Sequence, residues 1–198
     1  MVALTSRSVL AVMAKAPRVG VGKQRLARDV GRTEAWRVNR MLHAATLRAA
    51  CDRRWRTLLC VTPDRAAREA IGVWPRGIVR NAQGGGDLGA RLARALSPYR
   101  GVAVIGTDCA GLSRAHIAAA FAALKRAPFA LGATPDGGFW VLAARDGRAA
   151  ARAMARVRWS SPHAARDVLH NLAPARVAML AMLRDVDVAA DLAALRRA

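Results

Sequence analysis

Residues 102–112 read VAVIGTDCAGL, and this stretch decides the fold that the sequence predicts. Val102 to Gly106 is a short, uninterrupted apolar run of the kind typical of a buried strand in a parallel sheet. Thr107 to Leu112 follows as a loop and carries the carboxylate of Asp108. In open α/β sheets, ligands bind at the carboxyl ends of the strands. The stretch therefore predicts a central strand with a candidate ligand-binding carboxylate at its tip.

Outward from this strand, short apolar runs alternate with longer amphipathic runs, the pattern of a layered α/β domain. We expect the first two strands to lie beside residues 102–106, all three being parallel and adjacent in one sheet. No linker, repeat or low-complexity segment interrupts the pattern, which predicts one domain over residues 1–198. Strands are expected at residues 8–14, 57–61, 77–80, 102–106, 129–133, 139–144 and 176–183, and helices at 33–50, 87–96, 113–126, 161–172 and 189–197.

The composition is that of a globular protein, with 54% hydrophobic and 23% charged residues. No apolar run approaches the ~18 residues that a membrane-spanning helix needs. The apolar stretch near the start, Val9 to Ala14, is too short for the core of a signal peptide. The three cysteines form no C-x-x-C pair and fit reduced thiols. These features predict a cytoplasmic location.

A net charge of +20 raises the question of a nucleic-acid partner. The chain is rich in arginine and alanine and poor in lysine, a composition that GC-rich genomes produce whatever the protein does. Specific nucleic-acid binding calls for a basic cluster on one element and aromatic side chains that stack on bases. The arginines are scattered over most of the expected helices, and only 5% of residues are aromatic. Nucleic acid is therefore not the expected partner, although such a field would speed the capture of phosphorylated ligands.

Four segments at expected strand ends carry candidate binding residues. Residues 15–26, KAPRVGVGKQRL, offer glycine amides and the cations Lys15, Lys23 and Arg25 to an anion. This differs from a Walker loop because Pro17 and Gln24 replace the glycine and the hydroxyl residue of that motif. The alternative for this segment is a solvated basic turn.

The second segment, residues 83–91, reads QGGGDLGAR. Asp87 is placed to cap the next helix, but the glycines exceed what a cap needs and would let the backbone approach a base or ribose. The third is the loop of Asp108, whose carboxylate could hold a metal such as magnesium. Ser113 already serves as the cap of the following helix, which leaves Asp108 free for that role.

The fourth segment, residues 136–140, reads DGGFW and taken alone is an ordinary hairpin turn. Near the end of the chain, Asp185, Asp187 and Asp191 lie on an expected strand-to-helix turn. They could supply a second metal ligand or cap the last helix.

Taken together and in order, these segments resemble an uncharacterised bacterial glycosyltransferase-like family. That family belongs to the nucleotide-diphospho-sugar transferase superfamily with the GT-A fold, and its relatives include phospholactate and molybdenum-cofactor guanylyltransferases. The resemblance covers essentially the whole chain. This sequence departs from the family pattern at Gln24, where Thr is usual, and at Ala110, where Pro is usual; residues 188–190, VAA, replace Thr-Pro-Glu. The matching blocks are residues 14–27, 83–91, 106–112 (GTDCAGL), 136–140, 159–160 (WS) and 185–192 (DVDVAADL).

The resemblance implies a mixed, mostly parallel sheet flanked by helices in three layers. It further implies a transferase that uses a nucleoside triphosphate or nucleotide-sugar, with nucleotidyl or glycosyl transfer to a small acceptor and Mg²⁺ or Mn²⁺ as cofactor. A protein of this fold that binds a nucleotide or polyanion without catalysis is the alternative. The implied roles are catalytic for Lys23 and Asp108; nucleotide-binding for Lys15, Gly22, Lys23, Arg25, Gln83, Gly86 and Asp87; substrate-binding for Asp136, Gly137 and Gly138; and metal-ligating for Asp108 and Asp187.

Overall fold

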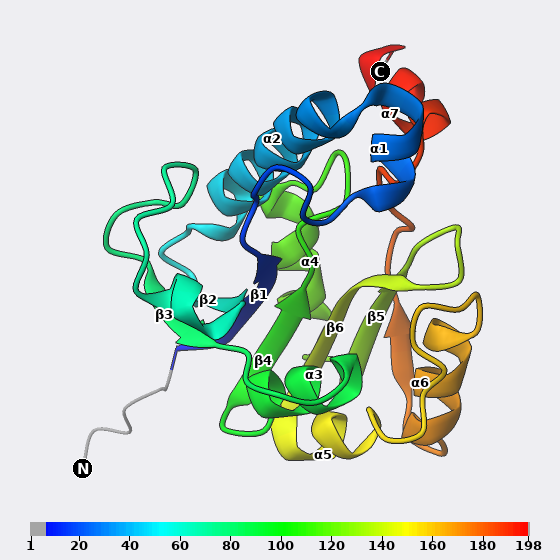
Figure 1. The fold of residues 1–198 in the computed structure, drawn as a ribbon. Coiled ribbons are helices and arrows are strands. Elements are labelled where there is room, and N and C mark those ends of the chain that lie inside the picture. Colours follow the sequence, from blue (N-terminus) through cyan, green and yellow to red (C-terminus); the bar gives the residue numbers. More distant parts are fainter. Residues whose placement is uncertain (1–6, 198) are drawn as a thin grey trace.

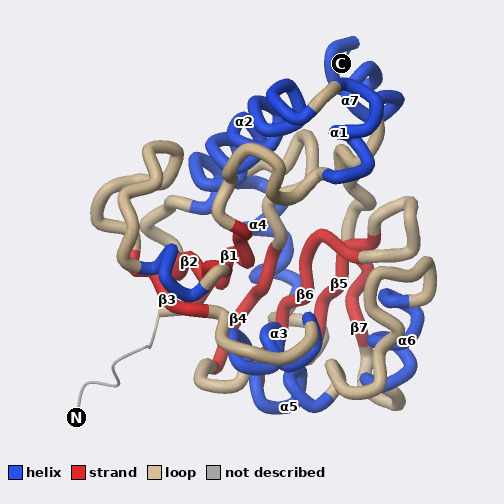
Figure 2. Tube along the Cα trace, viewed as in Figure 1, coloured by secondary structure: helices blue, strands red, loops and turns tan. Residues whose placement is uncertain are grey.

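The fold is built on one seven-stranded sheet flanked by helices, as the sequence predicts (Figures 1 and 2). The computed structural model describes residues 7–197, without the side chains of residues 196 and 197. The strand order is β3-β2-β1-β4-β6-β5-β7. The strands are β1 (Val9–Lys15), β2 (Arg56–Thr62), β3 (Val79–Ala82), β4 (Arg100–Ile105), β5 (Phe129–Ala133), β6 (Phe139–Asp146) and β7 (Val177–Met179). The helices are α1 (Gln24–Val30), α2 (Arg32–Ala50), the 3₁₀ turn η1 (Asp64–Ala67), α3 (Leu88–Leu96), α4 (Arg114–Ala123), α5 (Gly147–Arg152), α6 (Ala164–Leu172) and α7 (Ala189–Arg197).

The three strands expected to be neighbours are adjacent and parallel, which confirms that prediction. β1 lies between β2 and β4, with Leu10 opposite Thr57 on one side and opposite Ala103 on the other. β6 pairs antiparallel with both β4 and β5, so the sheet is mixed but mostly parallel. The carboxyl ends of β1, β2 and β4 therefore meet at one edge of the sheet, and β6 begins at the same edge.

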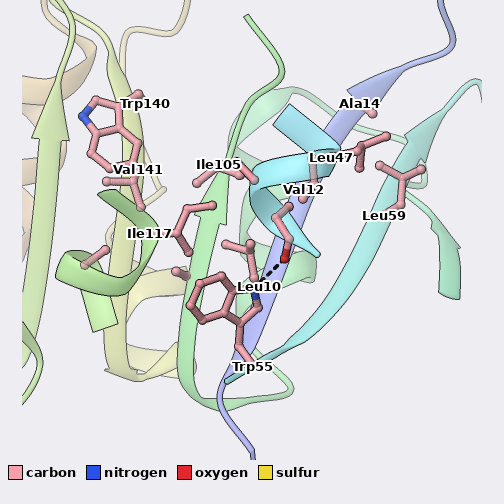
Figure 3. Packing of buried hydrophobic residues seen from close by; sticks show 14 of the residues in the cluster. Leu10, Val12, Ala14, Leu47, Trp55, Leu59, Ile105, Ile117, Trp140 and Val141 are labelled. Atoms are coloured by element: carbon pink, nitrogen blue, oxygen red, sulfur yellow. Dashed lines mark hydrogen bonds between the residues drawn. The ribbon is translucent and has the colours of Figure 1, made fainter. Parts of the chain in front are cut away.

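The core forms two layers, one on each face of the sheet. Alternate residues of β1 point to opposite faces, as strand geometry requires. Leu10 and Val12 belong to a cluster with Leu47 of α2, Ile117 of α4 and Trp55, which precedes β2 (Figure 3). The opposite face packs against α3, α5 and α6. Three layers, helix on sheet on helix, result.

A third, smaller cluster joins helices that extend beyond the carboxyl edge of the sheet. Leu26 of α1, Leu42 of α2 and Leu192 of α7 are buried together with Val186. This cluster fastens the loop after β1 to the last segment of the chain, although the two lie more than 150 residues apart in sequence. It is the reason that two distant loops can share one site.

Several element boundaries differ from the sequence prediction; α4 ends at Ala123 rather than residue 126, and α6 begins at Ala164 rather than residue 161. β3 begins at Val79 rather than residue 77, and β7 ends at Met179 rather than residue 183. Helices α1 and α5 were not expected. None of the described helices is long and apolar enough to cross a membrane.

Candidate functional site

The loop after β1 brings a lysine into the site through an unusual backbone conformation. Gly20 and Gly22 adopt positive φ angles, and Lys23 itself lies in the left-handed region with φ 48° and ψ 39°. Residues other than glycine rarely adopt this backbone conformation. The Lys23 side chain is 4% exposed, and α1 begins directly after it. Gln24 closes the loop by donating from its side-chain nitrogen to the carbonyl of Gly20 at 2.8 Å.

Two carboxylates from distant segments meet at the ammonium group of Lys23. Its Nζ lies 2.6 Å from Oδ1 of Asp108, after β4, and 3.1 Å from Oδ1 of Asp187, before α7. Arg25 is more exposed, with Nη1 at 3.8 Å from Oδ2 of Asp187. Burial lowers the pKa of Lys23, but the charges and hydrogen bonds of the two carboxylates outweigh it and raise the pKa above its ordinary value. Lys23 is therefore a charged ammonium that neutralises the acidic pair.

Backbone hydrogen bonds hold the two acidic segments together. The amide of Ala110 donates to the carbonyl of Arg184 at 2.8 Å, and the amide of Val186 donates to the carbonyl of Asp108 at 3.0 Å. Proline, which the family resemblance implies at position 110, would have no N–H to donate. The alanine thus allows a direct link between the two loops that carry the carboxylates.

A third carboxylate, Asp185, lies in the same segment in a more apolar setting. Burial, and then the charges of Asp136 and Asp187, raise the pKa of Asp185 to about 6. Asp191 plays a structural part, because its Oδ2 accepts the amides of Asp187 and Val188 at 2.9 and 3.0 Å. Of Asp185, Asp187 and Asp191, Asp187 is thus the residue whose carboxylate, together with that of Asp108, contacts the ammonium of Lys23.

A buried histidine supports the loop of Asp108 from behind, and the sequence analysis did not identify it. His43, on α2, accepts a hydrogen bond at Nδ1 from the indole of Trp74 at 3.2 Å. The proton of the neutral ring is therefore on Nε2, which donates to Oγ1 of Thr107 at 3.2 Å. Burial lowers the pKa of His43 to about 4; the charge of Asp108 raises it and that of Lys23 lowers it. The neutral ring thus orients the residue preceding Asp108.

The turn of Asp136 is shaped by its own side chain. Oδ1 of Asp136 accepts from Oγ1 of Thr134 at 2.6 Å and from the amide of Gly138 at 3.0 Å. Gly137 has φ 86°, and a Cβ added there would collide with the carbonyl of Pro162. The positive φ and the close approach together explain why a side chain is excluded at residue 137.

The glycine-rich segment before α3 is tied mainly to the sheet. The side-chain nitrogen of Gln83 donates to the carbonyls of Cys60 at 2.8 Å and Ala14 at 3.3 Å, so Gln83 joins β1 and β2. Asp87 caps α3 by accepting the amide of Ala90 at 2.8 Å. The capping role considered for Asp87 is thus present, and a contact of Asp87 with a nucleotide stays a prediction.

A pocket of about 580 Å³ opens at the carboxyl edge of the sheet. Of the residues expected in the site, seven line it: Lys15, Arg25, Gln83, Asp108, Asp136, Gly138 and Asp187. Lys23 lies beneath the carboxylates rather than on the wall, and Gly22, Gly86, Asp87 and Gly137 are not on the wall either.

Two aromatic residues and an arginine of the pocket wall were not predicted as site residues. Phe139 and Trp159 pack edge to face with ring centroids 6.3 Å apart. Gly89 of α3 lets Trp159 approach closely, since a Cβ there would lie 2.6 Å from its indole nitrogen. Arg91 also lines the wall and donates to the carbonyl of Gly86 at 3.0 Å. The adjacent residues 159–160 were noted only as part of the family resemblance.

The acidic pair fits a hard divalent metal by its chemistry. Asp108 and Asp187 supply carboxylate oxygens, the ligands that Mg²⁺ and Mn²⁺ prefer. In residues 7–197, no group of three or more His, Cys, Asp or Glu side chains is arranged to hold a metal. Magnesium commonly binds through one or two carboxylates and completes its shell with water and phosphate oxygens, which this pair allows. The cation that the pair already holds, the ammonium of Lys23, shows that both carboxylates reach one positive charge.

Comparisons with known proteins agree with this architecture. The sequence pattern of a family described as "Uncharacterized protein conserved in bacteria (DUF2064)" matches residues 44–161. The comparison with curated proteins gave no match.

Solved structures share the fold over nearly the full length. A protein named as a candidate nucleotide-diphospho-sugar transferase from Desulfovibrio desulfuricans G20 has a TM-score of 0.88 at 24% identity, with 97% of this chain and 87% of that chain covered. The 2-C-methyl-D-erythritol 4-phosphate cytidylyltransferase of Thermus thermophilus has a TM-score of 0.55 at 20% identity, covering 97% and 98%. Rv0371c of Mycobacterium tuberculosis H37Rv, in complex with manganese, has a TM-score of 0.54 at 16% identity, covering 96% and 99%. At such identities the likeness shows a shared nucleotide-diphospho-sugar transferase-like fold.

Proposed function

The chain belongs to the bacterial DUF2064 family, and from the geometry of its site we propose that it is a metal-dependent transferase. Its substrate would be a nucleoside triphosphate or a nucleotide-sugar, from which a nucleotidyl or glycosyl group passes to a small acceptor. The observation that carries the proposal is the convergence of Lys23, Asp108 and Asp187 beside a pocket at the carboxyl edge of the sheet. Solved structures of the same fold named as transferases and cytidylyltransferases support it.

The cations of the loop after β1 suit the binding of phosphate groups. Lys15 and Arg25 line the pocket, and Lys23 lies next to it. Lysine and arginine neutralise phosphate oxygens and form charge-assisted hydrogen bonds with them. Placed around one pocket, they would orient the phosphate chain and stabilise charge that develops on the leaving group.

Asp108 and Asp187 would hold the metal, and their position is set by the backbone bonds between their loops and by the hydrogen bond of His43 with Thr107. When bound, Mg²⁺ or Mn²⁺ would supply electrostatic neutralisation of the phosphate oxygens. Across the pocket, Asp136 and Gly138 would face the sugar or the acceptor. Phe139 and Trp159 would exclude water from that part of the pocket. The proposal includes a relationship between this chain and the phospholactate and molybdenum-cofactor guanylyltransferases.

A binding screen followed by product analysis tests the proposal. Nucleotides and sugar nucleotides, each with Mg²⁺ or Mn²⁺, should include a ligand that raises the melting temperature, because a ligand that binds the folded state stabilises it by mass action. Release of diphosphate would identify nucleotidyl transfer, and release of a nucleoside diphosphate would identify glycosyl transfer. Binding without turnover of any candidate donor would favour the non-catalytic alternative.

The substitution Asp108→Asn should abolish metal-dependent nucleotide binding while leaving the melting temperature nearly unchanged. The reason is that the Asp108 side chain is itself 54% exposed, and Asp187 remains to pair with the buried ammonium of Lys23. Calorimetry with and without Mg²⁺ measures the first effect. Asp146→Asn is the matched control, since it removes the same charge from the cap of α5, where asparagine caps equally well. A variant that loses stability but keeps its ligand would make Asp108 a structural residue.

A further inference from the structure

The ammonium group of Lys23 lies where two carboxylates of different loops would meet a metal ion. Its Nζ is 2.6 Å from Asp108 and 3.1 Å from Asp187, and its side chain is almost completely buried. Magnesium binds oxygen at about 2.1 Å, so an ion between the same two oxygens would overlap the ammonium group. The two cations exclude each other from this position.

The conformation of the loop after β1 places the ammonium of Lys23 at the carboxylates rather than on the pocket wall. Lys23 has a left-handed backbone conformation that long side chains rarely adopt. Lys15, at the end of β1, and Arg25, in the first turn of α1, both line the pocket, whereas Lys23 does not. In the structure, Lys23 is therefore the counter-ion of the acidic pair and is not on the pocket wall.

We infer that Lys23 is a built-in occupant of the metal position, and that metal binding requires it to move from Asp108 and Asp187 to the phosphate groups of the incoming nucleotide. The inference rests on the proposed function and concerns the regulation of that same site. A bare metal ion must compete with an ammonium that is already paired. A metal that binds together with a nucleotide polyphosphate brings phosphate groups with which the ammonium of Lys23 can pair after it leaves the carboxylates. Lys23 and the acidic pair then each keep a partner of opposite charge. Metal and nucleotide should thus bind together far better than either alone.

The inference predicts opposite effects of one substitution on two ligands. Lys23→Met should raise the affinity for Mn²⁺ alone about tenfold or more, the factor equivalent to one hydrogen bond to a charged group. The same variant should bind a metal–nucleotide complex more weakly than the wild type. Calorimetric titration with MnCl₂ measures the first effect. Lys15→Met is the matched control, because it removes an equal charge from the pocket wall without emptying the acidic pair, and it should change Mn²⁺ affinity much less.

The double variant Lys23→Met with Asp108→Asn assigns the gain to this site. If Mn²⁺ affinity rises in Lys23→Met and falls back in the double variant, the metal binds at the acidic pair. An unchanged Mn²⁺ affinity in Lys23→Met, or a gain that persists in the double variant, would overturn the inference.

Chemical labelling of the wild-type protein tests the same exchange without any substitution. The chain has three lysines, and Lys15 and Lys125 are exposed, so they serve as internal references for an amine-reactive reagent. Lys23 should react slowly in the metal-free protein and faster, relative to Lys125, when millimolar Mn²⁺ is present. If calorimetry shows Mn²⁺ bound to the wild type while labelling of Lys23 stays slow, lysine and metal do not compete. If no nucleotide binds, that result counts against the proposed function. The Mn²⁺ titrations and the labelling would still test whether Lys23 and the metal compete.

Discussion

At the scale of single residues, the site depends on charges whose partners come from distant parts of the chain. The sequence predicted Lys23, Arg25, Asp108 and Asp187 as site residues, and the structure brings these four together. The sequence could not predict that the ammonium of Lys23 contacts the two carboxylates themselves, because this contact depends on the left-handed backbone conformation at Lys23. Glycines predict a flexible loop but not the direction of the side chain that follows them.

His43 makes a prediction about stability and pH. In the folded protein the pKa of His43 is lowered from 6.5 to about 4, chiefly by burial. Between these values the unfolded chain binds a proton that the folded chain does not, so the free energy of unfolding should fall as the pH falls from about 6.5 to about 4. The full loss is at most about 3 kcal/mol. Denaturant titrations across this range measure it.

The matched variant for this prediction is His43→Gln, which removes the titrating group. The pKa of Asp185, raised to about 6, acts in the opposite direction, because its folded form holds the proton more tightly. The difference between wild type and variant cancels this contribution and isolates His43. Parallel pH curves for the two proteins would contradict the assignment of a buried, neutral His43.

At the scale of secondary-structure elements, the apolar strands and the longest helix were predictable, whereas the short helices α1 and α5 were not. The helices α2 and α7 and the strands β1, β2 and β4 lie where the pattern indicates, within one or two residues. Helix α1 escaped prediction because it has seven residues, and Lys23, at its start, provides no side-chain cap. The expected strand at residues 176–183 shortens to β7, whose regular pairing covers only Phe129 to Leu131 of β5; the next residues of β5, Gly132 and Ala133, are irregular also in their pairing with β6.

The rest of that expected strand remains bonded in an irregular way. The amides of Leu180 and Leu183 still donate to Leu131 and Ala133 at 2.9 and 3.3 Å, and the indole of Trp140 donates to the carbonyl of Ala181 at 2.9 Å. The apolar pattern thus predicted that the segment lies against β5, but not where its regular pairing ends. This irregular course carries the chain on to Asp187.

Ala110 links two elements of the site, and its replacement by proline should loosen them. Ala110→Pro removes the N–H that donates to Arg184 at 2.8 Å. The expected cost is about 1 kcal/mol of stability, the net contribution of one hydrogen bond, together with weaker metal-dependent binding. Ala110→Ser is the control because it keeps the N–H. Thermal unfolding and Mn²⁺ titration measure the two effects; equal behaviour of both variants would mean that the bond does not hold the loops together.

At the scale of the whole molecule, the net charge of +20 contrasts with the acidic site. The positive field belongs to arginines spread over the surface, while Asp108, Asp136, Asp185 and Asp187 gather at the edge of the sheet. The cations at the pocket itself are Lys15, Arg25 and Arg91 on its wall, with Lys23 at the acidic pair. The overall charge therefore acts on the arrival of an anionic ligand, and the local charges act on its binding once it has arrived.

This division predicts how salt affects ligand binding. Long-range attraction is screened beyond the Debye length, about 10 Å at 0.1 M salt, whereas contacts within the pocket are screened much less. Raising the salt from about 0.02 M to about 0.2 M should therefore slow the association of a nucleotide with its metal by roughly tenfold and change its dissociation rate little. Stopped-flow kinetics at several salt concentrations measure both rates.

Random-sequence DNA provides the comparison ligand for the salt experiment. Its binding would rest on counterion release alone, so it should be lost over the same range of salt in which nucleotide binding persists. A nucleotide should remain bound because, in the proposed site, Lys23 and Arg25 would contact its phosphate groups and the acidic pair would contact it through the metal. If DNA stayed bound at 0.2 M salt (about physiological strength) while nucleotides dissociated, the positive surface rather than the pocket would be the binding site, and the chain would be a polyanion-binding protein on a transferase fold.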